Sequence, residues 1–68
     1  MTMTTNEAIL EIVANTSLEE ACGFVTEWCN ASEVEIDESG NIWIANPMTG
    51  HWLDEEKKAQ FVAWANAQ

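Results

Sequence analysis

Apolar residues in the first half of the chain recur at the spacing of an α-helix, and the pattern predicts two helices. The first covers residues 6–14, and Thr4 with Glu7 has the spacing of a capping box at its start. Its apolar stripe consists of Ile9, Ile12 and Val13. The polar run Asn15 to Ser17 interrupts this pattern and separates the two helices.

The second predicted helix runs from Ser17 to about Asn30, and Ser17 with Glu20 forms a second capping-box pair. Its apolar positions repeat every three or four residues, so they are expected to face the core. These positions are Leu18, Ala21, Cys22, Val25, Trp28 and Cys29.

The period changes from helical to alternating in the middle of the chain. Residues 34–37 alternate between apolar and acidic side chains, residues 42–45 alternate isoleucine with Trp43 and Ala45, and the turn-forming sequence 38–41 separates the two segments. This pattern predicts a β-hairpin. Its inward-facing residues are expected to be Val34, Ile36, Ile42 and Ile44.

The remainder of the chain predicts an irregular loop over 46–50 and a last helix that Asp54 caps and that ends near Ala67. The expected core face of this helix is Phe61, Val62 and Ala65, with Trp64 at its edge. Because an isolated hairpin is marginally stable in water, helices must cover one of its faces. The sequence therefore predicts one α+β domain over residues 1–68, with two N-terminal helices, a β-hairpin and a C-terminal helix.

Charge narrows the range of partners. The chain has twelve carboxylates, two lysines and no arginine, with a formal charge of −10, whereas solubility alone is met by a magnitude of roughly 2–8. Binding phosphates requires clustered Lys and Arg, so neither nucleic acid nor an anionic membrane is expected as a direct partner. A basic protein surface is the natural complement.

Cysteine spacing and the N-terminus indicate the cytoplasm. Cys22 and Cys29 would lie about 10.5 Å apart along a helix, beyond the roughly 7 Å between Cα atoms that a disulfide spans. We therefore expect two free, buried thiols, as in a reducing compartment. Residues 1–4 lack the basic and apolar regions of a signal peptide, and no apolar run approaches the ~18 residues of a membrane span.

No combination of residues is typical of an active site. His51 is the only histidine, and no cysteine or second histidine lies at a metal-ligand spacing from it. Glycine-rich phosphate loops and nucleophile elbows are absent from the sequence. We expect a binding protein with no catalytic residue, metal or cofactor. A small hydrolase or metal enzyme that uses His51 is the third alternative, behind the two binding functions given below.

The hairpin is the predicted binding site. Glu33, Glu35 and Asp37 are spaced by two residues, about 6.7 Å, and are expected to project from one face together with Trp43. The full set of predicted partner-binding residues is Glu20, Glu27, Glu33, Glu35, Asp37, Glu38 and Trp43. Alternatively, Trp43 packs under the last helix and the carboxylates protect a sheet edge from aggregation. Trp28 and Trp64 are expected in the core, and the pattern does not assign Trp52.

The small size, the near absence of cations and the run of Glu33, Glu35, Asp37 and Glu38 give the chain a resemblance to small acidic phage anti-defence proteins, in particular anti-CRISPR proteins and other DNA mimics. The resemblance is one of composition and covers the whole chain. It implies a non-catalytic inhibitor in the cytoplasm of a bacterial host, bound to the Lys/Arg-rich nucleic-acid-binding surface of a larger protein such as a CRISPR effector or nuclease. The alternative function is a small adaptor or regulatory domain that binds its partner through Trp43, Trp52 and the 46–52 loop.

Overall fold

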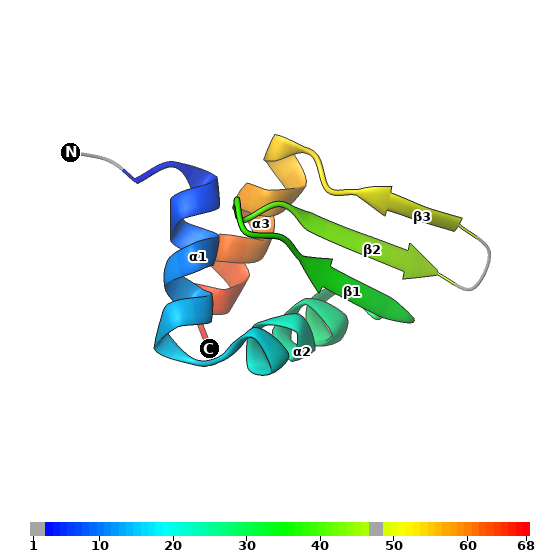
Figure 1. Cartoon of the computed structure of the whole chain (residues 1–68), viewed down its shortest axis with the longest axis horizontal. Helices are drawn as coiled ribbons and strands as arrows, with labels where there is room; N and C mark the ends of the chain where they lie inside the picture. Colours follow the sequence, from blue (N-terminus) through cyan, green and yellow to red (C-terminus); the bar gives the residue numbers. More distant parts are fainter. Residues whose placement is uncertain (1–2, 47–48) are drawn as a thin grey trace.

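A computed structural model describes residues 3–46 and 49–68 of the chain (Figure 1). The elements in order are α1 (Thr5–Asn15), α2 (Leu18–Cys29), β1 (Glu33–Ile36), β2 (Ile42–Asn46), β3 (Thr49–Trp52) and α3 (Glu55–Asn66). The helices and an antiparallel sheet with strand order β1-β2-β3 form a small α+β domain. The predicted fold class and the predicted hairpin, which is β1 with β2, are confirmed.

The helices begin at the residues that the capping pattern indicated. The Thr4 hydroxyl accepts a hydrogen bond from the Glu7 backbone N–H at 3.0 Å, and the Glu7 carboxylate accepts one from the Thr4 N–H at 2.8 Å. The side chains of Ser17 and Asp54 each accept a hydrogen bond from the backbone N–H three residues further along. Each cap pairs one of the N–H groups that a helix leaves without a partner at its start.

The third strand corrects the prediction of an irregular loop over 46–50. Asn46 ends β2, and Thr49 and Gly50 belong to β3, while residues 47 and 48 of that predicted loop lie outside the described residues. All four residues of β3 are exposed, so the strand has no buried apolar position. The alternation that identifies a half-buried strand from its sequence is therefore missing.

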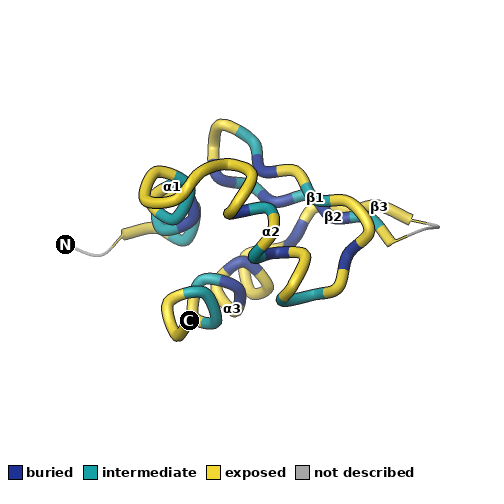
Figure 2. The backbone as a smooth tube through the Cα atoms, turned by 90° about the horizontal axis from the view of Figure 1, so that it is seen from below, coloured by how far each residue is buried: buried dark blue, intermediate teal, exposed yellow. Residues whose placement is uncertain are grey.

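The core lies between the sheet and the helices. In Figure 1 the helices lie beside and behind the sheet, and Figure 2 shows that the buried residues gather on the sides of the elements that face one another. α2 packs along β1, and α1 packs against α3. The buried apolar residues are Ile9, Ala21, Val25, Ala31, Ile36, Ile42, Ile44, Leu53 and Phe61.

Most of the predicted core positions are confirmed. Val34 is half-buried, and the other three inward positions of the hairpin are buried. Phe61 is fully buried, with its ring centroid 5.6 Å from that of Trp28 and 6.3 Å from that of Trp64. Leu18 is the exception, because its side chain is 54% exposed. Leu18 is the first residue of α2, so no earlier turn of the helix lies before it to cover its side chain.

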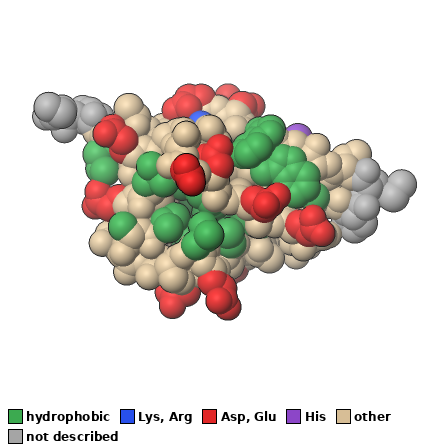
Figure 3. Space-filling model, viewed as in Figure 1, with side chains coloured by type: hydrophobic (Ala, Val, Ile, Leu, Met, Phe, Trp, Pro, Cys, Tyr) green, Lys and Arg blue, Asp and Glu red, His purple; other side chains and the backbone are tan. Residues whose placement is uncertain are grey.

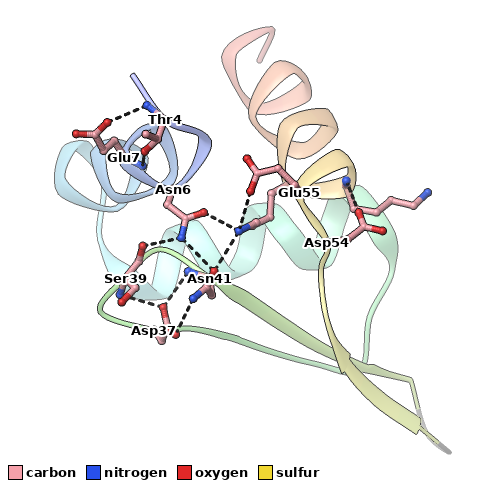
Figure 4. Close-up of polar contacts among 10 residues, drawn as sticks. Thr4, Asn6, Glu7, Asp37, Ser39, Asn41, Asp54 and Glu55 are labelled. Atoms are coloured by element: carbon pink, nitrogen blue, oxygen red, sulfur yellow. Dashed lines mark hydrogen bonds and ion pairs between the residues drawn. The ribbon is translucent and has the colours of Figure 1, made fainter. Parts of the chain in front are cut away.

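Lys58 lies inside the domain and joins three elements, and its partners Asn6, Asn41 and Glu55 are labelled in Figure 4. Only 6% of it is exposed. Its ammonium donates hydrogen bonds to Asn6 Oδ1 of α1 at 2.6 Å and to Asn41 Oδ1 at 3.1 Å, and it lies 3.3 Å from a carboxylate oxygen of Glu55. The Asn6 amide in turn donates to the Ser39 carbonyl at 2.9 Å. One of the two lysines is therefore a structural residue that ties α3 to α1 and to the β1–β2 turn.

The β1–β2 turn approaches α1 closely at Gly40. This glycine has a φ of 87°, and a Cβ atom placed on it would lie 2.5 Å from the Asn6 carbonyl oxygen. Both the left-handed backbone and the close approach therefore require glycine at this position.

Candidate binding surface on the open sheet face

One face of the sheet points away from the core. Because side chains alternate along a strand, the positions between the buried isoleucines project to the other side. We call this surface the open sheet face and define it by Glu33, Glu35, Trp43, Ala45, Gly50 and Trp52. In Figure 3 hydrophobic side chains gather over β2 and β3 on this face, with carboxylates beside them.

Trp43 is at the centre of the open sheet face. It lies opposite Glu35 of β1 and opposite Trp52 of β3. A Cβ atom at Gly50 would overlap with the Cζ2 atom of Trp43, so the indole lies across the backbone of β3 at a position that has no side chain. Trp43 is half-buried by this contact. It projects with the β1 carboxylates as predicted, and the alternative that it packs beneath the last helix is wrong.

Trp52 supplies a second indole on the same face. Its side chain is 56% exposed. The next pair of residues along β2 and β3, Ile42 and Leu53, is hydrogen-bonded, because the Leu53 N–H donates to the Ile42 carbonyl at 2.8 Å. Trp52 and Trp43 therefore form a non-hydrogen-bonded pair, in which Cα atoms are typically about 4.5 Å apart and side chains lie close together. The sequence left Trp52 unassigned because β3 was not predicted.

Of the three carboxylates that the sequence predicted as a row on one face, only two lie on the open sheet face. Glu33 and Glu35 are exposed on β1 and project from the open sheet face. Asp37 instead shapes the turn: its Oδ1 accepts hydrogen bonds from the N–H groups of Ser39 and Asn41 at 2.9 and 2.8 Å, and its Oδ2 accepts one from the Asn41 amide at 3.3 Å. The hydrogen bond from the Asn41 backbone is the main cause that lowers the pKa of Asp37.

The other predicted carboxylates lie outside the open sheet face. Glu38 is exposed in the β1–β2 turn, next to Asp37. Glu20 and Glu27 are exposed on α2, which packs along β1. The residues that were predicted as one site thus divide into a sheet group, a turn group and a helix group. Only Glu33, Glu35 and Trp43 share a face, and the structure adds Trp52 to them.

The charge around this face is negative. Of the two lysines, Lys58 is internal and hydrogen-bonded, and Lys57 lies in the first turn of α3. An indole ring attracts a cation above its face, and a carboxylate accepts charge-assisted hydrogen bonds from Arg or Lys. Two indoles beside two carboxylates are therefore suited to a surface rich in Arg and Lys.

The candidates for chemistry are not among the residues of the open sheet face. Both cysteines are free and half-buried. Burial raises the pKa of the Cys22 thiol, and the nearby Glu35 carboxylate raises it further, so the thiol is a weak nucleophile at neutral pH. His51 is exposed on β3, opposite Ile44. Within residues 3–46 and 49–68, no group of three His, Cys, Asp or Glu side chains is arranged to hold a metal ion.

The chain was compared with protein-family models and with curated proteins. No protein-family model matches the chain, and no curated protein matches it. Within the described part of the chain, no helix has the length and apolar character that crossing a membrane requires. The surface itself is therefore the basis for inferring a function.

Proposed function

We propose that the protein is a non-catalytic inhibitor that binds the Lys/Arg-rich nucleic-acid-binding surface of a larger protein through its open sheet face and blocks DNA or RNA. The observation that carries this proposal is the placement of Glu33 and Glu35 on one exposed face with Trp43 and Trp52. An arginine side chain can stack on an indole while its guanidinium forms a bidentate pair with a carboxylate.

The spacing of these groups supports mimicry of a nucleic acid. Carboxylates two residues apart on a strand are separated by about 6.7 Å, and the charges on each strand of duplex DNA repeat about every 3.4 Å along the helix axis, so the two carboxylates span about two charges measured along that axis. Proteins that bind single strands combine a basic groove with contacts to the faces of the bases. In this proposal Glu33 and Glu35 replace phosphates, and the indoles of Trp43 and Trp52 replace bases.

The two kinds of side chain have different effects on binding. The formal charge of −10 steers a basic partner toward the protein, and such steering raises association rate constants from about 10⁵–10⁶ to 10⁸ M⁻¹s⁻¹ or more at low salt. The tryptophans act mainly on dissociation, because a buried aromatic anchor at an interface centre typically contributes ~2 kcal/mol or more.

The second candidate function is an adaptor domain that binds through its aromatic residues alone. The exposure of Trp52, at 56%, favours this alternative. A complex held mainly by the two tryptophans would resist salt, whereas a complex held by carboxylates weakens as the Debye length falls from about 30 Å at 0.01 M to 8 Å at 0.15 M. Salt dependence therefore separates the two functions.

The test is capture of partners from a bacterial lysate by three immobilised proteins at low and moderate salt. The wild type is compared with E33Q/E35Q and with E20Q/E27Q, which changes the charge equally but lies on α2. We expect the wild type and E20Q/E27Q to retain a nucleic-acid-binding protein that salt releases, and E33Q/E35Q to lose it. Circular dichroism checks that each variant is folded. If E20Q/E27Q alone loses the partner, the binding surface is on α2 and the open sheet face is not the site.

A further inference from the structure

A pocket lies at the junction of α1, α2 and the end of β1. Its volume is about 210 Å³, and it is lined by Leu10, Val13, Leu18, Ile36, Asp37 and Glu38. The exposed leucine at the start of α2 thus forms one wall of a hollow whose other apolar walls come from α1 and β1. In Figure 3 hydrophobic side chains are visible in this region on the same side of the molecule as those over β2 and β3.

The size and lining of this pocket fit a single apolar side chain. Pockets that hold small molecules usually measure about 300–1,000 Å³ and contain several convergent polar groups. Here Leu10, Val13 and Leu18 supply an apolar wall, and the Asp37 carboxylate is already occupied by hydrogen bonds within the turn. A metabolite would find little to orient it, whereas a Leu, Met or Phe side chain would bury its surface.

Charge indicates where such a side chain comes from. Glu38 lines the pocket, and Glu33 and Glu35 are exposed on β1, the strand whose end forms one of its walls. A second copy of this chain would bring another formal charge of −10 against these carboxylates, and like charges that meet at an interface cost affinity. A protein segment that carries Lys or Arg beside its apolar residue matches both the pocket and the carboxylates around it.

We propose that this pocket is the anchor point for an apolar side chain of the same basic partner that the open sheet face binds. The inference rests on the proposed function and adds a rule of specificity to it. A partner must present an apolar residue next to its Lys and Arg residues, so a basic nucleic-acid-binding surface without such an anchor is bound weakly. Carboxylates alone would not make this distinction, because every basic surface attracts them.

The test uses two synthetic peptides that share the same Lys and Arg positions and differ at the positions between them, which are leucine in one peptide and serine in the other. Binding is followed by NMR of the methyl groups of Leu10, Val13 and Leu18 and of the tryptophan indole N–H groups. We expect both peptides to shift the indole signals in a salt-dependent manner. Only the leucine peptide should shift the methyl signals, and its affinity for the protein should be at least about tenfold higher than that of the serine peptide.

The L18A variant should remove the advantage of the leucine peptide and leave the affinity for the serine peptide unchanged. Leu18 is exposed and alanine is the best helix former, so the fold should be retained. The control is M3A, because Met3 is also exposed, at 49%, and does not line this pocket.

Equal affinity of the two peptides for the wild type would overturn the inference, and the proposed function would stand if that binding depends on salt and on Glu33 and Glu35. If neither peptide binds, both are overturned. Because this comparison uses the wild-type protein, it decides the question even if a variant does not fold.

Discussion

Replacing Lys58 by methionine tests whether the polar contacts inside the domain hold its elements together. The substitution keeps a long apolar stem and removes the ammonium, which donates to Asn6 Oδ1 at 2.6 Å and to Asn41 Oδ1 at 3.1 Å. Asn41 Oδ1 keeps a second donor, the Asn6 amide at 3.0 Å. The cost therefore falls mainly on the Asn6 oxygen.

The contacts allow the size of the effect to be estimated. Hydrogen bonds to a charged group contribute about 1.5–3 kcal/mol each, and an unpaired buried acceptor costs about 1–3 kcal/mol. The ion pair with Glu55 adds little, because that side chain is 71% exposed and solvent screens the attraction. Removing a buried ammonium also relieves its desolvation cost. We expect a net loss of about 2–4 kcal/mol from Lys58→Met.

Such a loss is large for this domain. At about 0.05–0.15 kcal/mol per residue, a chain of this size has a total stability of about 3–10 kcal/mol. The melting temperature should fall by roughly 8–30 °C, at 4–8 °C for each kcal/mol. Urea and thermal unfolding by circular dichroism measure both quantities.

The matched control is Lys57→Met, which makes the same change of charge on the adjacent, exposed residue. It should change stability by no more than about 0.5 kcal/mol. If Lys58→Met is as stable as Lys57→Met, the ammonium contributes nothing net and the central role given to these contacts is wrong.

Two further predictions concern the β1–β2 turn. Gly40→Ala should destabilise the protein by more than about 1–2 kcal/mol, which is the cost of the left-handed backbone alone, because its Cβ would also lie 2.5 Å from the Asn6 carbonyl oxygen. The control is Gly23→Ala, in an open position on α2, which should instead stabilise the protein by about 0.5–1 kcal/mol. If urea unfolding shows the same change in stability for both variants, the explanation given for Gly40 is wrong. Asp37→Asn should be less stable than the wild type at neutral pH, because hydrogen bonds in the folded state lower the pKa of Asp37 below the ordinary carboxyl value. A lowered pKa means that the contribution is complete above about pH 4 and is lost as the pH falls through the folded-state value. The difference in the free energy of unfolding between the wild type and Asp37→Asn should therefore narrow below pH 4. A difference that widens below pH 4 would refute the role of the Asp37 carboxylate in stabilising the turn.

The sequence predicts the helices and the hairpin because each has a strong local pattern. Thr4, Ser17 and Asp54 cap the helices where the sequence places them. β3 lacks such a pattern, because all four of its residues are exposed and none marks a buried face. Residues that pair only through the fold leave little trace in hydrophobic periodicity.

The sequence contains a signal for two of the residues that form polar contacts inside the domain. Lys58 is three residues before the buried Phe61, so helical spacing places it on the core face of α3. Asp37 precedes the turn sequence Glu-Ser-Gly-Asn over 38–41, where an aspartate commonly accepts hydrogen bonds from the following backbone N–H groups. The sequence alone treats Asp37 as a binding residue because alternation continues the β1 pattern through it.

Competition with nucleic acid tests the central claim most directly. The captured partner is first bound to a fluorescent oligonucleotide, and the protein is then titrated in while anisotropy reports release. The proposed function predicts complete, salt-sensitive displacement by the wild type, no displacement by E33Q/E35Q at the same concentrations, and faster loss of the complex with W52A. Formation of a ternary complex, with the oligonucleotide still bound, would contradict the claim that the open sheet face occupies the nucleic-acid-binding surface.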